Sequence, residues 1–401
     1  ESAWALNPDK TLLQFPHRNW RVEDGLPQNS ILSIEQTSDG YLWAAGNTAS
    51  GRLGIGSTGA GTQKFATRVV KSTTAGDYLT NVVEVAAGGA FALALDSTGK
   101  VWSFGENSSS QLANGSSGTS DRNYAGYVYS TSGTSTPLEN VIQIAAGQAH
   151  GLALQSDGKV QAWGERLNGR LGNGSTATGN VYIPVTVQKD ASEGGGDLTG
   201  IIAIAAGPRH NLALASDGRV WSWGKNGNSQ LGRNGTTDHA YADLVEVGGQ
   251  PLENVVAIGA GGVDVSGTLT GFSYLILDDG RLYAWGKNTN GQLGNGSTTD
   301  VSAPAQTGAS FRVSKQAPSI TSLDATGIFV APAAVTLSAT VSDPESDPVA
   351  RVEFYVDDVL VGSATAAPFE IAWNDAVSGT YTISARAFDE TGAGGPLASE
   401  P

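Results

Sequence analysis

The chain repeats itself about every 60 residues, and a repeat of that length constrains the fold because each copy must form a unit that packs on the next. The clearest marker is an aromatic residue followed by glycine. It occurs at Phe104-Gly105, Trp163-Gly164, Trp223-Gly224 and Trp285-Gly286, with a degenerate copy in Tyr41–Gly46. Seven positions after each glycine comes a leucine, at Leu53, Leu112, Leu171, Leu231 and Leu293. The chain therefore contains five copies of one unit.

Each copy is predicted to be a small antiparallel sheet. A two-residue turn such as Asp157-Gly158 or Asp217-Gly218 precedes the aromatic strand, as a tight hairpin requires. Two apolar strands come before that turn, and residues 181–187 have the pattern of a fourth. Four strands per copy, with no helical periodicity, indicate an all-β fold built from the blades of a β-propeller.

These motifs resemble the regulator of chromosome condensation repeats, whose blades carry an Ala-Ala-Gly, His, Leu-Ala-Leu, Asp-Gly, Trp-Gly, Gln-Leu-Gly series. Residues 141–174 and 201–235 match that series almost throughout, and the likeness covers residues 40–312. The resemblance implies a β-propeller domain over residues 1–312. Members of this family usually close a ring of seven blades, whereas five copies are present here, so the ring is either smaller or incomplete.

The segment before the first clear copy has a second likeness. Residues 14–43, which include Trp20–Ile31 and Tyr41-Leu42-Trp43, resemble the propeller repeat in the sensor regions of bacterial two-component regulators. One such unit runs directly into the Arg52-Leu53 element. We expect a hybrid first blade, and a recombined reading frame is the alternative.

The composition changes after residue 312. A linker at 313–317 leads into strands of alternating polarity at 334–341, 349–356 and 381–387, typical of a β-sandwich. Residues 318–401 resemble the immunoglobulin-like domains of large secreted bacterial proteins. We expect no further strand in the Gly-Pro-Ser tail after Ala387, and hence a truncated sandwich. With Glu1 in first place and no methionine in the sequence, we expect a fragment of a longer chain.

The repeated side chains are predicted to be structural. His150 and His210 occupy one row of the repeat in which another copy has Phe91, so packing or local hydrogen bonding is the simplest role. The tryptophans could stack on sugars, but a residue that recurs at one place in a strand is more typical of a core. We assign the same structural role to the repeated glycines and leucines: Gly164, Leu171, Gly224, Leu231, Gly286 and Leu293.

Several classes of function find no support. The chain has no cysteine, which excludes thiol chemistry, and it lacks the common hydrolase, phosphate-binding and zinc-protease motifs. We therefore predict no enzyme activity and no cofactor. A net charge of −15 argues against nucleic-acid binding, and no apolar stretch is long enough for a membrane span.

Acidic residues offer one candidate metal site. Asp343, Glu345 and Asp347, with Asp389 as a distant contributor, could supply oxygen ligands to calcium. Their spacing fits no calcium loop, so a solvated turn is the preferred interpretation and no metal is predicted.

Two segments depart from the repeat and are candidates for partner binding. Residues 116–136 contain Tyr124, Tyr127 and Tyr129 among serine, glycine and asparagine, the composition of recognition loops. Between Gly261 and Gly271 the fifth copy inserts nine residues when Leu275 is matched with Leu152, and Asp264 and Thr268 lie in that insertion. A tolerated surface insertion is the alternative.

Together these features predict a non-enzymatic scaffold whose propeller loops bind another protein. Its composition and sandwich are typical of an exported bacterial protein, at the cell surface, in the periplasm or outside the cell. Two alternatives stay open. The family resemblance implies nucleotide exchange on a small GTPase, with the Gly261–Gly271 insertion as a wedge; exposed tryptophan and carboxylates would instead suit a polysaccharide-binding or polysaccharide-active protein.

Overall fold

We analysed a computed structural model of the chain. It describes residues 33–36, 41–57, 59, 61–133, 136–233, 235–265, 268–307, 318–327, 333–343, 349–377, 379–389 and 397–400. The chain divides near residue 309 into two compact units. The predicted 313–317 linker and most of the 14–43 segment lie outside the described residues.

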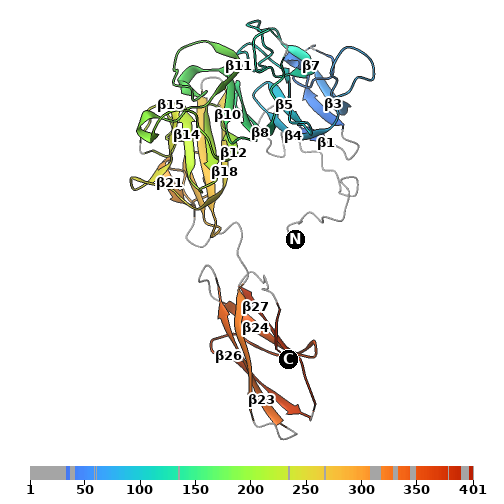
Figure 1. The fold of residues 1–401 in the computed structure, drawn as a ribbon, viewed down its shortest axis with the longest axis vertical. Helices are drawn as coiled ribbons and strands as arrows, with labels where there is room; N and C mark the ends of the chain where they lie inside the picture. The colour runs from blue at the N-terminus through green and yellow to red at the C-terminus, as the bar shows by residue number, and fades with distance from the viewer. Residues whose placement is uncertain are drawn as a thin grey trace. The chain divides into compact units, whose positions relative to one another are not determined.

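The first unit contains five larger antiparallel sheets that follow one another along the chain (Figure 1), together with one two-stranded hairpin. Blade 1 has three described strands: β1 (Ser33–Gln36), β2 (Leu42–Asn47) and β3 (Thr62–Arg68). Blade 2 consists of β4 (Val82–Ala87), β5 (Phe91–Asp96), β6 (Val101–Gly105) and β7 (Arg122–Tyr127). Blade 3 consists of β8 (Val141–Ala146), β9 (His150–Gln155), β10 (Val160–Glu165) and β11 (Asn180–Thr186).

Blades 4 and 5 repeat the same meander. Blade 4 consists of β12 (Ile201–Ala206), β13 (His210–Ala215), β14 (Val220–Gly224) and β15 (His239–Leu244). Blade 5 consists of β18 (Val255–Val265), β19 (Thr268–Leu277), β20 (Leu282–Gly286) and β21 (Val301–Gln306). Smaller elements connect these strands: η3 (Ala49–Gly51), η4 (Leu167–Gly169), η5 (Ala191–Glu193), and the hairpin of β16 (Glu246–Val247) with β17 (Gln250–Pro251).

The hairpin chemistry read from the sequence explains the turns inside each blade. Gly158 has a φ of 79°, and the carboxylate of Asp157 accepts a hydrogen bond of 3.1 Å from the amide of Lys159. Asp217 and Arg219 make the same contact in blade 4, also at 3.1 Å. Asp-Gly is therefore the pair that allows the second and third strands to meet with little strain.

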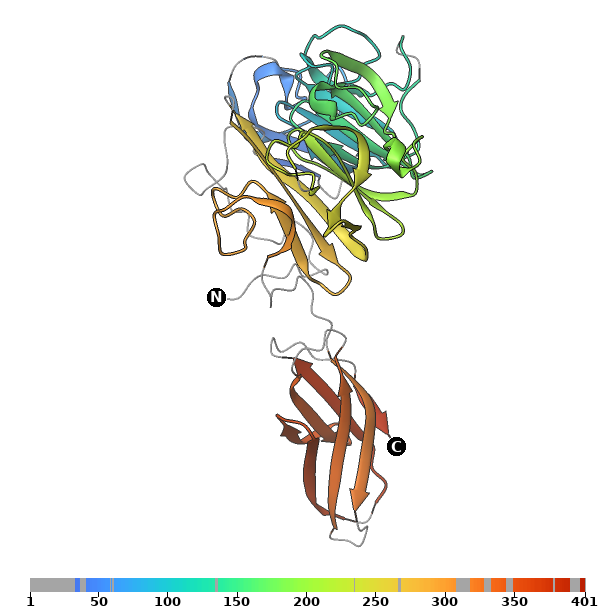
Figure 2. The same cartoon turned by 90° about the vertical axis from the view of Figure 1, so that its left-hand side faces the viewer.

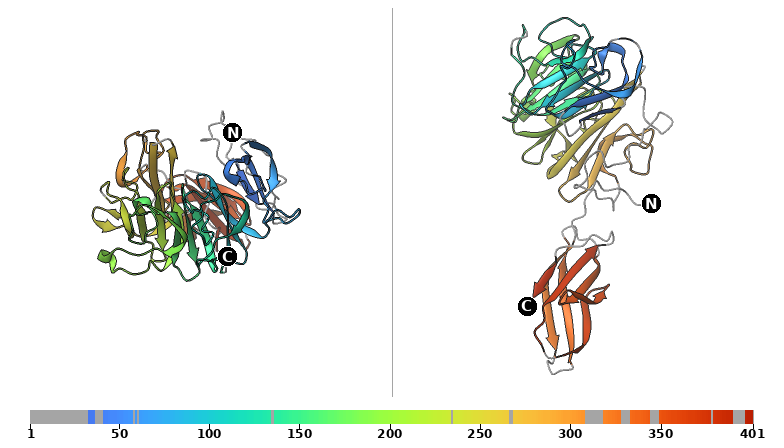
Figure 3. Two further views of the ribbon diagram at one scale, coloured as in Figure 1. Left: turned by 90° about the horizontal axis from the view of Figure 1, so that it is seen from above. Right: turned by 90° about the vertical axis from the view of Figure 1, so that its right-hand side faces the viewer.

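The core of the propeller lies between the blades. Four clusters of buried side chains each join two consecutive blades. The first strands β4, β8, β12 and β18 contact one another in that order, and we call them the inner strands. Within the described residues no such cluster joins blade 5 to blade 1, and the two blades stand at the ends of an arc in the left panel of Figure 3.

The second unit is a sandwich of two antiparallel sheets, drawn in orange to red in Figure 2. One sheet contains β22 (Ser319–Gly327), β23 (Ala333–Ser342) and β26 (Phe369–Ala376). The other contains β25 (Val359–Ala364), β24 (Val349–Val356), β27 (Ile383–Asp389) and β28 (Ala398–Glu400). Leu337, Val352 and Phe354 are fully buried between them. The all-β prediction, a propeller followed by a sandwich, is confirmed.

One expectation for the sandwich was wrong. A strand does follow Ala387, because Ala398, Ser399 and Glu400 pair with Ala385, Ser384 and Ile383 of β27. Three residues are too few to show an alternating pattern in the sequence. The strand forms because its backbone pairs with the N–H and C=O groups along the edge of β27.

Candidate interaction surfaces

The repeated tryptophans connect neighbouring blades. Their indole N–H groups each donate a hydrogen bond to a carbonyl of the preceding blade: Trp163 to Gln111 at 2.9 Å, Trp223 to Arg170 at 3.1 Å, and Trp285 to Gln230 at 2.8 Å. All three side chains are fully buried. They therefore present no face to a sugar, and Gly164, Gly224 and Gly286 continue the strands behind them. Leu171, Leu231 and Leu293 are also buried, and Leu171 packs in the interblade cluster that contains Trp223.

The two repeated histidines bond to the following blade. Nε2 of His150 lies 2.7 Å from Oδ1 of Asn211, and Nε2 of His210 lies 3.0 Å from Oγ of Ser273. Burial lowers the pKa of His210 to about 4. Burial, reinforced by the positive charge of Arg170, lowers the pKa of His150 to about 3. Both imidazoles are neutral at physiological pH and have no contact with solvent, which suits an interior hydrogen bond and not acid–base chemistry.

The long loops after the Trp-Gly motif are organised by buried asparagines. The amide oxygens of Asn107, Asn226 and Asn288 accept a hydrogen bond from the N–H of the repeat leucine at 2.9 to 3.1 Å. Blade 3 has Arg166 in this row and builds its loop differently. There the buried guanidinium of Arg170 pairs with Glu165 at 2.7 Å and donates to the carbonyl of Leu167. Buried polar side chains thus hold these loops from the inside of the fold.

Part of the predicted tyrosine loop, Arg122–Tyr127, is a strand. Tyr124 and Tyr127 lie in β7, the outermost strand of blade 2, because pairing with β6 overrides the weak strand propensity of the surrounding serine and glycine. The Tyr127 ring lies on Trp102 at 3.9 Å between centroids, and Tyr129 approaches Tyr127 edge-on at 6.4 Å. All three tyrosines are half-buried, so they form part of the blade's side wall.

The insertion in the fifth copy is an extension of one hairpin. Strands β18 and β19 continue to pair through Val263 with Thr270 and Val265 with Thr268, well past the length of the other inner hairpins. Asp264 and Thr268 lie in these paired ends, and their side chains are outside the described residues. The extension is a two-stranded projection and not an irregular loop.

The predicted size of that insertion was wrong by one residue. Trp163 pairs with Gly151 and Trp285 with Ser273, so Tyr274, and not Leu275, stands in the row of Leu152. Gly147 and Leu152 are five positions apart, whereas Gly261 and Tyr274 are thirteen apart, which makes the insertion eight residues. The alignment of the repeats matched Leu275 with Leu152 because both are leucine. The strand pairing, which decides equivalence, matches Tyr274 with Leu152.

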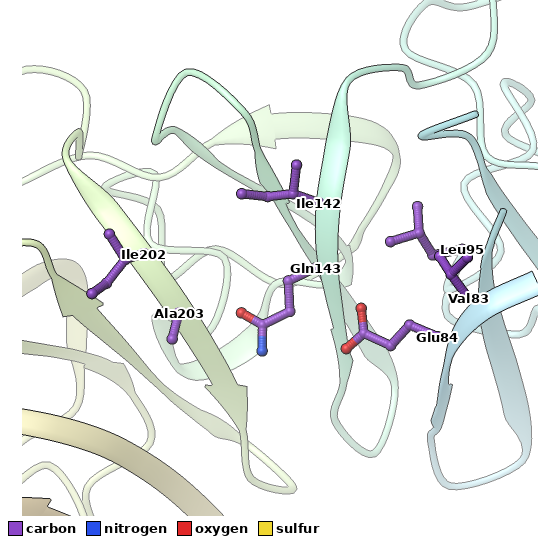
Figure 4. Close-up of a pocket in the computed structure, with 7 residues that line it drawn as sticks. All are labelled: Val83, Glu84, Leu95, Ile142, Gln143, Ile202 and Ala203. Carbon is purple, nitrogen blue, oxygen red and sulfur yellow. The ribbon is translucent and has the colours of Figure 1, made fainter. Parts of the chain in front are cut away.

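A third surface was not foreseen from the sequence. An open pocket of about 480 Å³ lies where the inner strands β4, β8 and β12 begin. Its wall includes Val83, Ile142 and Ile202, together with Glu84 and Gln143, whose side chains point toward the next inner strand (Figure 4). A signal was present in the sequence: residues 82–85, 141–144 and 201–204 place apolar residues at adjacent positions, which a regularly alternating strand would not do.

Other candidate sites gain nothing from the structure. Pro344–Pro348 lies outside the described residues, so the acidic turn between Asp343 and Val349 has no structural account. Among the residues that are described, no three His, Asp or Glu side chains are grouped as a metal site. None of the described helical segments has the length and apolar character to cross a membrane.

The fold and its interblade contacts define a β-propeller of a particular kind. Residues 28–327 match the RCC1-like domain family and residues 318–385 the bacterial Ig domain family. The chain belongs to the RCC1-like domain family, which confirms the predicted relationship.

Individual relatives are similar over the propeller. The human E3 ubiquitin-protein ligase HERC2 is 32% identical over 270 residues, which is 67% of this chain but 5% of HERC2. Protein pim1 of Schizosaccharomyces pombe is 30% identical over 56% of the chain and 41% of its own length. The chain thus spans a small part of the first of these proteins and less than half of the second.

Solved structures share the fold. Human WBSCR16 superposes with a TM-score of 0.53 at 20% identity, covering 76% of this chain and 73% of its own. Prp20p of Saccharomyces cerevisiae gives a TM-score of 0.50 at 22% identity, covering 69% and 63%.

Proposed function

We propose that the chain is a non-enzymatic binding module whose propeller contacts another protein through the β18–β19 hairpin. The observation that carries this proposal is the paired extension of that hairpin by eight residues beyond the inner hairpins of the other blades. Hydrogen-bonded strands hold the extension in one direction, and Val263 within it is 40% exposed. A rigid projection with an exposed apolar side chain loses little entropy when a partner covers it.

Relatives support a protein as the partner. Prp20p has been studied for its binding to Gsp1p and histones, and a yeast RCC1 (Prp20) structure contains bound Kap60. These partners belong to those proteins. For this chain they favour the broad class, a protein ligand, while the acidic net charge of −15 favours a ligand with basic groups.

The test removes the extension without disturbing the blade. In blade 4, Pro208 and Arg209 connect the first two strands. They occupy the place in the repeat that residues 262–271 occupy in blade 5. A variant in which Pro-Arg replaces 262–271 keeps the core, because the carbonyls of Arg209 and Gly271 each accept the same contact from the strand that follows. Affinity capture with the full chain should enrich a partner that this variant loses. Equal capture by both proteins would refute a role for the hairpin.

A second candidate is nucleotide exchange on a small GTPase, favoured by the same hairpin acting as a wedge. It predicts that the purified chain accelerates release of labelled GDP from a small GTPase and that the shortened variant does not. Capture of a partner without any change in GDP release would leave the binding module as the function.

The bacterial Ig-like sandwich supports an exported location, at the bacterial surface or beyond it. Fractionation of the source cells with an antibody against the sandwich tests this location. Recovery in the cytoplasmic fraction alone would contradict it.

A further inference from the structure

The pocket between the inner strands originates in a β-bulge that recurs in four blades. In β4, Val82 pairs with Asp96 and Glu84 with Leu95, so Val83 has no partner on β5. The same break leaves Ile142, Ile202 and Val256 unpaired in blades 3, 4 and 5. A bulged residue is turned away from the regular ladder, and these four side chains are 56–59% exposed. We call Val83, Ile142, Ile202 and Val256 the bulge row.

The bulge row is a concentration of exposed apolar surface. Single exposed apolar residues are ordinary in soluble proteins, whereas one β-branched residue at the same position of four consecutive blades is a repeated feature. Val83, Ile142 and Ile202 line the pocket, and Ala203 widens it beside Ile202. An occupant would gain apolar contact from several blades at once.

Glu84 gives the pocket a charge that the fold does not require. Its carboxylate accepts a hydrogen bond of 2.9 Å from the amide of Ile144 in the next blade. Gln143 does the same one blade later, accepting from the amide of Ile204 at 2.8 Å with a neutral side chain. A half-buried carboxylate costs more free energy than an amide at such a position, and burial raises the pKa of Glu84. Within the described part of the chain, no lysine, arginine or histidine is paired with it.

We propose that this pocket binds a lysine or arginine of a protein partner, with apolar neighbours of that residue covering the bulge row. The cation would lie at the Glu84 carboxylate, and the adjacent side chains would cover Ile142 and Ile202. Charge complementarity selects this occupant over an acidic or uncharged segment, and the net charge of −15 favours its approach.

The site is separate from the hairpin of the proposed function. The bulge row lies where the inner strands begin, at Val256 in blade 5, whereas the hairpin extension lies at the other end of that strand, beyond Gly261. Binding at the hairpin and binding at the bulge row can therefore be lost independently. The shortened-hairpin variant should keep all binding that depends on Glu84.

Fluorescence anisotropy with three labelled peptides on the full chain tests the proposal. The peptides combine leucine with lysine, with glutamate or with serine at the same spacing. We expect saturable binding of the leucine–lysine peptide alone. Glu84→Gln should weaken it about tenfold, and Gln143→Glu, which adds a second carboxylate in the next blade, should strengthen it. Both changes keep the acceptor that bridges the blades, whereas Gln143→Glu gives up the 3.3 Å bond that Nε2 of Gln143 donates to the carbonyl of Ile204. Thermal unfolding of each variant therefore accompanies the binding measurement.

Matched controls separate the site from general attraction to an acidic protein. Glu370→Gln makes the same change in net charge at an exposed position of the sandwich and should have no effect. Ile142→Ser should weaken binding several-fold, whereas Phe65→Ser, at a residue that is 80% exposed in β3, should not. Equal weakening by Glu84→Gln and Glu370→Gln, binding of the serine or glutamate peptide as tight as that of the lysine peptide, or no binding at all would overturn the proposal.

Discussion

Nε2 of His150 in blade 3 lies 2.7 Å from Oδ1 of Asn211 in blade 4, and both side chains are fully buried. One blade earlier the corresponding residues are Phe91 and Gly151, which have no polar side-chain atoms. Histidine thus occurs opposite a polar residue and phenylalanine opposite glycine. The two residues of each pair lie in different blades, about 60 positions apart in the chain.

This pairing predicts a coupling energy. His150→Phe should destabilise the fold by roughly 2 kcal/mol, since it leaves the Asn211 oxygen buried without a donor. Combining it with Asn211→Gly should recover part of that loss by recreating the Phe91–Gly151 arrangement, although Asn211 also donates to the carbonyl of Arg170. Urea unfolding of the two single variants and the double variant measures the coupling. Strictly additive losses would show that the pair does not act as a unit.

The buried histidines predict acid sensitivity. Their pKa values in the folded chain, about 3 for His150 and about 4 for His210, lie below the ordinary value of 6.5. The unfolded chain therefore binds more protons below pH 6.5, so stability is full above that pH and falls as the pH drops toward 4. We expect a loss of roughly 2 kcal/mol per histidine between pH 7 and pH 5. Urea midpoints across this range measure it, and His150→Gln with His210→Gln should flatten the profile.

Replacing tryptophan by phenylalanine should not cost the same in every blade. The Gln230 carbonyl accepts from Ser273 as well as from Trp285, and the Arg170 carbonyl from Asn211 as well as from Trp223. The Gln111 carbonyl has Trp163 as its described side-chain donor, with Gly151 in the row of Asn211. Trp163→Phe should therefore destabilise by about 1 kcal/mol more than Trp223→Phe in thermal unfolding. If Trp223→Phe destabilised the fold more than Trp163→Phe, the loss of a donor to the carbonyl would not explain the difference.

The glycine of the Trp-Gly motif predicts a backbone effect. Gly164 has a φ of 100°, and a β-carbon there would lie 2.5 Å from the carbonyl oxygen of Ala149. Gly164→Ala should cost more than about 3 kcal/mol, because strain and a backbone clash combine. Gly195, with a φ of 63° and open space around it, is the matched control and should cost about 1 kcal/mol. Similar losses at both sites, measured by chemical denaturation, would attribute the effect to φ alone.

The sequence predicted the blades well because its strongest signals are local. Asp-Gly turns, apolar strands and the Trp-Gly motif act within a few residues, and the structure has the hairpins they indicate. The contacts between blades could not be read in this way. Nothing near His150 in the chain identifies Asn211 as its partner, and the bulge at Ile142 depends on how β8 pairs with β9.

Composition misled the prediction at the candidate surfaces. Serine and glycine around Tyr124 suggested a loop, whereas the edge of β6 supplies enough backbone pairing for a strand. Matching Leu275 with Leu152 gave an insertion one residue too long, since side-chain identity was used where strand register decides. The bulge row was missed because the adjacent apolar residues of segments such as 141–144 were interpreted as a continuous apolar strand, and not as a break in its alternation.

The His150–Asn211 and Phe91–Gly151 pairs imply that these repeats are not interchangeable parts. A duplicated or transplanted blade supplies one residue of the pair with the preceding blade and one residue of the pair with the following blade. The neighbouring blades must supply the matching residues. The intervals 91–151 and 150–211 overlap, so a single recombination boundary anywhere between Phe91 and Asn211 separates the two members of at least one pair and can join histidine to glycine or phenylalanine to asparagine. Evolution or engineering that exchanges blades of this propeller must therefore change both residues of a pair together.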